Sequence, residues 1–270
     1  MTRADPDHGP DPWTLHADWW QAQFTDGADA EYTEQILPMA AEHLRGTTRV
    51  LDIGAGEGQV SRVAASVQGV DMVTAVDLSW FQLETGRQRA GGPAFAAAQA
   101  TALPFHDGSF DAAVACLVFE HIDDADAALA EVARVLEPGG RFLFFLNHPL
   151  LQTPGSGWID DTILEEQYWR IGPYLVEDTT LEEVDKDVFI PFVHRPLSRY
   201  VNSMAAFGLL VTHMDEPAPP PGFLARAQEY AEAATIPRLL FLRAEKHPHP
   251  LRPLSAPPPP PPPPPPVAST

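Results

Sequence analysis

Short apolar runs alternate with helical repeats along the first half of the chain. Residues 49–53 form one such run, and small apolar residues then recur at helical i, i+3, i+4, i+7 spacing, at Val60, Val63, Ala64 and Val67. Further strands are predicted at 71–77, 93–99, 110–119 and 141–146, and further helices at 80–89 and 125–136. Alternation of this kind specifies a parallel sheet with helices on both faces.

The segments that flank this pattern differ from it. Residues 13–48 are predicted to be helical, whereas residues 147–195 are rich in aromatic and acidic side chains. A helix at 197–207, a short helix near 223–234 and strands at 209–214 and 238–245 follow. We predict a flexible N-terminus over 1–12, one α/β domain over 13–246 with a lid from 13–45 and 147–195, and a disordered proline-rich tail over 247–270.

Composition narrows the range of partners. The 270 residues carry a net charge of −20 at pH 7, which disfavours nucleic acid and anionic membrane surfaces. Cys116 is the only cysteine, so no internal disulfide can form, and no apolar run is long enough to span a bilayer. We expect a cytoplasmic monomer or homodimer without a metal site.

A glycine-rich turn joins the first strand to the first helix of the alternating region. Gly54, Gly56 and Gly58 form a G-x-G-x-G sequence there. Free backbone N–H groups at such a helix start attract a carboxylate or a phosphate. The dinucleotide fingerprint G-x-G-x-x-G needs a third glycine one residue later, where this chain has Gln59. A nicotinamide cofactor is therefore disfavoured without being excluded.

Two acidic residues indicate more closely which class of ligand the glycine turn binds. Asp77 ends the second strand, where a carboxylate can hold the two hydroxyls of a ribose, although it would also serve to cap the next helix. Asp52 lies inside the first strand, just before the glycine turn, and there it would repel a pyrophosphate. It suits a ligand with both a carboxylate and an ammonium group, such as the methionine end of S-adenosylmethionine. The alternative is that Asp52 is a structural residue bonded to loop amides, and the two roles are compatible.

Four motifs together resemble the class I S-adenosylmethionine-dependent methyltransferases, in the small-molecule group known as methyltransferase type 11. They are "VLDIGAGEG" (50–58), "VDLS" (76–79), "ALPFHDGSFDAAVACLVFEHIDD" (102–124) and "EVARVLEPGGRFLFF" (131–145). The resemblance implies a Rossmann-like α/β fold with a seven-stranded, mostly parallel sheet in the order 3-2-1-4-5-7-6, strand 7 antiparallel, and a helical lid. It also implies transfer of a methyl group to O, N or C of a small-molecule acceptor.

The resemblance assigns roles to residues that match the motifs. Gly54, Gly56 and Gly58 would line the methionine moiety with Asp52, Asp77 would hold the ribose, and Leu78 would lie against the adenine. Gln99 stands where the family usually has an acid that binds the adenine amino group. The remaining positions implied to contact the cofactor are Ala100 and Thr101 beside the ring, and Cys116 and Leu117 beside the sulfonium.

The acceptor side has weaker signals. His148, His121 and His194 are candidate general bases, and His148, which directly follows the fifth predicted strand, is the first choice. Aromatic residues of the insert are candidates for an acceptor pocket, namely Trp158, Tyr168, Trp169 and Tyr174. Tyr32 is placed to close over the cofactor. Two alternatives stay open: a NAD-dependent dehydrogenase, and a non-catalytic protein that binds S-adenosylmethionine.

Overall fold

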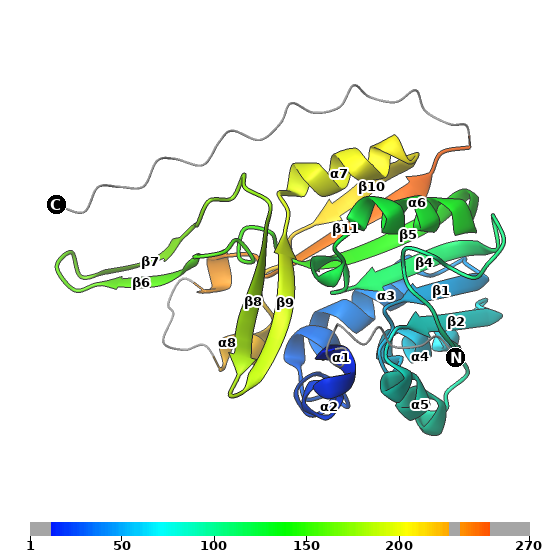
Figure 1. The fold of residues 1–270 in the computed structure, drawn as a ribbon, viewed down its shortest axis with the longest axis horizontal. Coiled ribbons are helices and arrows are strands. Elements are labelled where there is room, and N and C mark those ends of the chain that lie inside the picture. The colour runs from blue at the N-terminus through cyan, green and yellow to red at the C-terminus, as the bar shows by residue number, and fades with distance from the viewer. Residues whose placement is uncertain (1–11, 227–232, 249–270) are drawn as a thin grey trace, which may run out of the picture.

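The computed structural model describes residues 12–226 and 233–248, which form a central twisted sheet with helices on both faces (Figure 1). The sheet has seven strands in the order β10-β11-β5-β4-β1-β2-β3. Their bounds are β1 Arg49–Ile53, β2 Met72–Asp77, β3 Ala94–Ala97, β4 Phe110–Cys116, β5 Leu136–Asn147, β10 Leu209–Asp215 and β11 Leu239–Lys246. Strand β11 is antiparallel to both β5 and β10, while the other neighbours run parallel. The predicted order 3-2-1-4-5-7-6 with an antiparallel seventh strand is confirmed.

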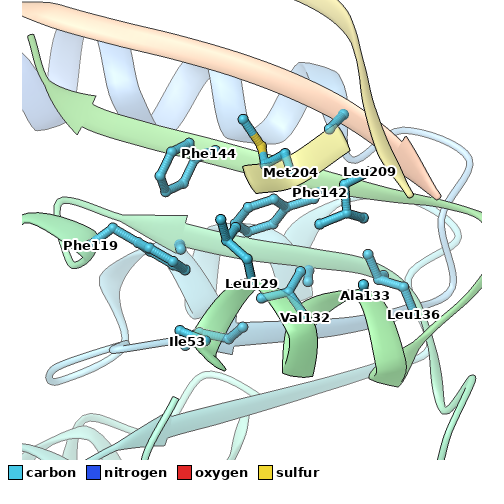
Figure 2. Close-up of a cluster of buried hydrophobic side chains, with 14 of the residues drawn as sticks. Ile53, Phe119, Leu129, Val132, Ala133, Leu136, Phe142, Phe144, Met204 and Leu209 are labelled. Carbon is cyan, nitrogen blue, oxygen red and sulfur yellow. The ribbon is translucent and has the colours of Figure 1, made fainter. Parts of the chain in front are cut away.

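Two apolar layers hold the sheet between its helices. The helices are α3 Leu37–His43, α4 Gln59–Ser66, α5 Trp80–Arg89, α6 Ala125–Val135 and α7 Leu197–Ala206. On one face, Phe142 and Phe144 of β5 pack with Leu129 of α6 and Met204 of α7 (Figure 2). On the opposite face, alternate residues of the same strands pack on α3 and α4, because successive strand side chains point to opposite sides.

Helix boundaries in the first half follow local sequence signals. Helix α5 begins after Ser79, whose hydroxyl accepts the backbone N–H of Gln82, and α6 begins after Asp124, whose carboxylate accepts that of Ala127. Strand β4 is shorter than the predicted 110–119, because Leu117 has φ +54° and cannot continue it. The chain then makes the short 3-10 turn η2, Phe119–His121.

Strand β5 begins earlier than predicted. Helix α6 ends at Val135, and the sequence Pro138-Gly139-Gly140 lies within the strand, where the pairing register with β4 shifts between Phe110 and Ala112. Gly139 has φ +81°, and a side chain on Gly140 would lie 2.9 Å from the carbonyl oxygen of Glu137. The glycines therefore allow a bulge within the first residues of the strand.

The segments predicted to form the lid are only partly helical, which corrects the prediction that the lid is helical. Its N-terminal part consists of α1 Pro12–Leu15, α2 Ala17–Phe24 and the π-helix η1 Tyr32–Ile36. The insert 147–195 instead forms two antiparallel hairpins, β6 Gly157–Asp161 with β7 Glu166–Arg170, and β8 Asp178–Asp185 with β9 Val188–His194. Figure 1 shows β8–β9 standing beside the sheet and β6–β7 extending away from it.

The remaining described segments are short. A single helical turn, α8 Pro221–Leu224, and the 3-10 turn η3 Ala233–Thr235 lie in the connection from β10 to β11. Half of the helix predicted near 223–234, nearly all of the N-terminus 1–12, and most of the tail 247–270 with its prolines lie outside the described residues. None of the helices in the described ranges has the length and apolar character that crossing a membrane requires.

Candidate cofactor site and adjoining cavity

A cavity of about 450 Å³ opens at the carboxyl ends of β1, β2 and β4. Ligands of parallel α/β sheets bind at this edge. The predicted cofactor residues in its lining are Asp52, Gly54, Gly56, Asp77, Leu78, Gln99, Ala100, Thr101, Cys116 and Leu117. Gly58 and His148 are not part of the lining. No cluster of three or more His, Cys, Asp or Glu side chains suited to a metal ion occurs within residues 12–226 and 233–248.

The glycine turn shapes the floor of this cavity. Gly54 has φ +67°, and a methyl group added to it would lie 2.5 Å from Cγ2 of Val118. Gly56 has φ +56°, and a methyl group added to it would meet no atom within 4 Å, so this side of the residue faces open space. Gly58 acts differently, because a methyl group there would lie 2.8 Å from the ring of Phe95. Gly54 and Gly58 permit close packing, while Gly56 leaves room for a ligand against the backbone.

Asp77 is held in one orientation at the end of β2. The backbone N–H of Gly56 donates to its Oδ2 and that of Ser79 donates to its Oδ1, both at 2.8 Å. A carboxylate has about four lone-pair sites, so both oxygens can accept further hydrogen bonds. The residue thus connects the glycine turn to the start of α5 and presents a fixed acceptor to the cavity. Helix α5 itself is capped by Ser79 rather than by Asp77.

Asp52 is a buried carboxyl with one oxygen directed to no protein donor. The hydroxyl of Ser61 on α4 donates to Oδ2 at 2.5 Å, whereas Oδ1 is buried and has no hydrogen-bond partner among the described residues. Burial, together with the charges of Asp77 and Glu57, raises the pKa of the Asp52 carboxyl to about 7, against the lowering effect of the Ser61 bond. A ligand ammonium group would supply the donor and charge that this oxygen lacks.

The far end of the cavity is a short loop between β3 and β4. Gln99 pairs with Ala102 through a backbone bridge, which turns the chain beside the cavity. Arg134 of α6 ties this loop to the helix by donating to the carbonyl oxygens of Leu103 at 2.9 Å and Phe105 at 2.6 Å. The loop is therefore fixed by α6 rather than by its own secondary structure.

Cys116 and Leu117 lie where β4 ends. The Cys116 thiol donates weakly to the Tyr32 hydroxyl at 3.9 Å, and burial raises the pKa values of both groups well above their usual range. The thiol is thus poorly suited to act as a nucleophile. Leu117 has the left-handed φ of +54°, an unusual conformation for a bulky residue that is characteristic of functional sites.

A second cavity, of about 470 Å³, adjoins the first. Four residues line both cavities, namely Trp20, Tyr32, Leu117 and His121. The aromatic insert residues predicted to form an acceptor pocket do not line either cavity: Trp158 and Trp169 contact each other edge to face within the β6–β7 hairpin, and Tyr174 contacts His194. The aromatic walls of the second cavity are instead Trp19, Trp20, Phe24, Tyr32, Phe192 and Phe223.

The three candidate histidines have separate environments. His148 is buried beside the sheet, where Nε2 lies 2.7 Å from Glu216 and Nδ1 accepts the backbone N–H of Leu150 at 3.2 Å. With both ring nitrogens bonded and no place in either cavity lining, His148 is not positioned as a general base. His194 binds the carbonyl oxygen of Tyr174 and also lies outside both linings. His121 is the one of these three histidines that borders the cavities.

Several cavity residues escaped the sequence analysis. Trp13 and Trp20 of the N-terminal helices and Thr25 after them line the first cavity. Their only sequence signal was a concentration of aromatic residues in a predicted helical segment. The helices are placed over the cavity by long-range contacts, including the hydroxyls of Thr14 and Ser79 at 3.0 Å, which sequence periodicity does not report.

The fold and the central motifs match known methyltransferases. Residues 51–144 match the family model described as a methyltransferase domain. The ubiquinone/menaquinone biosynthesis C-methyltransferase UbiE of Methylobacterium nodulans is 38% identical over 47% of this chain and 51% of its own length. The O-methyltransferase rstn1 of Aspergillus nomiae is 33% identical over 47% of this chain and 60% of its own length. This chain therefore spans only about half to three fifths of these two relatives.

A solved structure extends the likeness to most of the chain. An S-adenosylmethionine-dependent methyltransferase from Mesorhizobium loti superposes with a TM-score of 0.67 and 27% identity, covering 77% of this chain and 96% of that one. Residues 51–144 are thus similar to a methyltransferase domain, and the chain has the fold of the S-adenosylmethionine-dependent methyltransferases.

Proposed function

We propose that this protein transfers a methyl group from S-adenosylmethionine to a small-molecule acceptor. The observation that carries the proposal is the pairing of an open glycine turn with a buried, half-partnered carboxyl, Asp52, in one cavity. When bound, the cofactor supplies a methyl group already activated by a positively charged sulfur. The protein's task is then to orient the acceptor, exclude water and receive any proton that the acceptor releases.

The residues of the first cavity suit the parts of this cofactor. The backbone N–H groups of the glycine turn and of the start of α4 would bind its carboxylate, and Asp52 would face its ammonium group. Asp77, fixed by two backbone donors, would accept hydrogen bonds from the ribose hydroxyls. The exposed side chain of Leu78 and the loop at Gln99 would contact the adenine, and Gln99 would accept from its amino group without adding charge.

The lid would separate the reacting groups from water. Trp13 and Trp20 line the first cavity from above the sheet edge, and Tyr32 and Leu117 lie where the two cavities meet. The acceptor is proposed to enter the second cavity and to approach the methyl group at this junction. The relatives include a C-methyltransferase and an O-methyltransferase, so both carbon and oxygen acceptors fit the proposal.

Ligand binding tests the cofactor directly. Isothermal titration calorimetry should show binding of S-adenosylhomocysteine and no binding of NAD. Asp77→Ala should weaken that binding at least tenfold, whereas Asp71→Ala, an exposed acid just before the amino end of β2, should leave it unchanged. Binding of NAD without S-adenosylhomocysteine would favour the dehydrogenase and contradict the proposal.

Turnover separates an enzyme from a silent binding protein. Incubation with S-adenosylmethionine labelled with tritium in its methyl group, in a metabolite extract, should give a labelled small molecule that depends on Asp77. Tight cofactor binding with no transfer into any extract would contradict the proposed activity. The oligomeric state, proposed to be monomer or homodimer, is measurable by light scattering, and the proposed compartment is the cytoplasm.

A further inference from the structure

We infer that Nε2 of His121 accepts a hydrogen bond from a ring hydroxyl of the acceptor, and that the second cavity selects uncharged aromatic compounds that carry such a hydroxyl. This inference rests on the proposed methyl transfer and names its substrate class. His121 belongs to the 3-10 turn η2, directly after the strained residue Leu117 and the end of β4. It lines both cavities, so its ring lies at their shared boundary.

The hydrogen bonding of His121 fixes its tautomer. Nδ1 lies 2.8 Å from the carbonyl oxygen of Pro191 on β9. A carbonyl oxygen can only accept, so Nδ1 carries the proton. In a neutral imidazole, Nε2 then carries a lone pair and no hydrogen. Because β9 belongs to the insert, the hairpin β8–β9 sets the protonation pattern of a residue at the edge of the cofactor cavity.

The packing of His121 keeps the ring neutral and in place. The ring of Trp13 lies 4.6 Å away, centroid to centroid, and that of Phe192 lies 4.7 Å away. Burial lowers the pKa of His121 to about 4, although the Pro191 hydrogen bond opposes this effect. Near neutral pH the residue is thus an acceptor at Nε2, suited to a hydroxyl donor and unsuited to a carboxylate.

The walls of the second cavity indicate what else the acceptor contains. Six aromatic side chains line it, which favours a planar ring. Among its charged side chains, carboxylates outnumber guanidinium groups: Asp29, Glu31, Glu182 and Asp185 against Arg226 and Arg238. Glu31 already pairs with Arg238 at 2.9 Å. An acceptor with its own carboxylate would therefore be repelled, whereas a neutral phenol would not.

The step balances without any further reactant. The acceptor oxygen forms a bond to the methyl carbon while the sulfur–carbon bond breaks and leaves its electron pair on sulfur. The hydroxyl proton stays hydrogen-bonded to Nε2 of His121 while the new bond forms, and it then leaves to water. His121 would thus touch the acceptor at the reacting oxygen, which makes it a catalytic residue under this proposal.

Paired probes test the inference in the presence of saturating S-adenosylhomocysteine. The probes are 2-naphthol and 2-fluoronaphthalene, which have similar shapes but differ in the hydroxyl donor. Calorimetry should show that the parent protein binds 2-naphthol up to about tenfold more tightly, the value of one hydrogen bond. Equal affinities, or no binding of either probe, would overturn the inference.

Variants locate the source of that preference. His121→Asn keeps a donor near Nδ1 and removes the acceptor at Nε2, so the preference should disappear. His121→Gln keeps an amide oxygen near Nε2 and should keep part of it, which also guards against a general folding defect. His194→Asn is the matched control. His194 is also a buried histidine bonded to a backbone carbonyl oxygen, but it lies outside both cavities, so this variant should distinguish the probes as the parent does.

The outcomes separate this inference from the proposed function. His194→Asn should bind S-adenosylhomocysteine as the parent does, and the probes are compared in each His121 variant at a concentration that saturates that variant with S-adenosylhomocysteine. A parent that binds S-adenosylhomocysteine but does not distinguish the probes, or a preference that survives in His121→Asn, contradicts only the role of His121. A parent that does not bind S-adenosylhomocysteine contradicts the proposed function itself.

Discussion

The hydroxyl of Ser61 donates to Oδ2 of Asp52 at 2.5 Å, while Oδ1 of the same carboxyl is buried without a partner among the described residues. The two residues come from α4 and β1, on either side of the glycine turn. One oxygen of Asp52 is therefore bonded within the protein, and the other has no protein donor in a residue that lines the cavity. The raised pKa, about 7, places the ionisation of this carboxyl within the range of ordinary assay conditions.

Cofactor affinity should depend on pH through Asp52. A protonated carboxyl does not attract an ammonium group, so affinity for S-adenosylhomocysteine should rise by about tenfold between about pH 6 and pH 8 as Asp52 ionises. Calorimetry across this range measures the slope. Asp52→Asn should bind more weakly at pH 8 and show a much flatter slope. A parent-like slope in Asp52→Asn would assign the pH dependence to another group.

The stability of the ligand-free protein should change with pH in the opposite direction. The folded-state pKa of Asp52 lies above its unfolded value, so protonation favours folding. This contribution is fully present below about pH 4 and is lost as the pH rises through about 7, at roughly 1.4 kcal/mol per pKa unit. Urea unfolding at about pH 5 and pH 8 should show a smaller difference for Asp52→Asn. Part of the pH dependence of stability should remain in Asp52→Asn, because Glu120 is another buried carboxyl with a pKa of about 7.

Cys116 offers a chemical probe of cavity occupancy, because it is the only cysteine in the chain. Its buried thiol, with a raised pKa, should react with iodoacetamide far more slowly than a free thiol at pH 8. S-adenosylhomocysteine should slow the reaction further, since Cys116 lines the cavity. Mass spectrometry follows the rate, with urea-unfolded protein as the reactive control. Fast alkylation that the ligand leaves unchanged would place the thiol outside the bound region.

The left-handed backbone at Leu117 predicts an unusual order of stability. Leu117→Gly and Leu117→Ala both lose the same packing, but glycine accepts φ +54° without steric cost. Leu117→Gly should therefore be the more stable variant by ~1 kcal/mol, the reverse of the order in helices and strands. Denaturant unfolding measures this difference. An alanine variant as stable as the glycine variant would show that the backbone relaxes to a negative φ.

Gly54 and Val118 should be energetically coupled. A methyl group on Gly54 would lie 2.5 Å from Cγ2 of Val118, so Gly54→Ala should cost ~2–4 kcal/mol from overpacking and positive φ together. Gly46→Ala is the matched control, since its φ of +78° is similar but its surroundings are open. In a double-mutant cycle, Val118→Ala should recover part of the Gly54→Ala loss. Strict additivity would show that the strain lies in the backbone alone.

Local patterns were sufficient to predict the elements of the sheet core. Strand β1 and helix α5 occupy the predicted residues, because their apolar spacing and flanking caps are contained in the segments themselves. The hairpins of the insert were not predicted. Several residues of β6 and β8 are exposed or only partly buried, so they lack the apolar alternation that identifies a half-buried strand.

In the candidate site, too, some residues could be predicted from local sequence patterns and others could not. Residues on the glycine turn and at the ends of β1, β2 and β4 could be located from the sequence, because a parallel sheet brings strand ends to one edge. His148 also follows a strand end, yet its ring turns to Glu216, a residue far along the chain. The tautomer and the orientation of the His121 ring depend on its contacts with Pro191 and Trp13. These residues reach His121 only when the insert and the N-terminal helices have folded.

The position of β11 has a consequence for how the chain is made. Ribosomes deliver β10 before β11, yet β11 inserts between β10 and β5. Strand β5 carries Phe142 to Phe145 in the middle of the core. Its free backbone edge is therefore covered only after β11 has been synthesised. Until then a nascent chain exposes an unpaired, strongly apolar edge, and this is the stage of biosynthesis at which two unfinished copies are most open to pairing with each other.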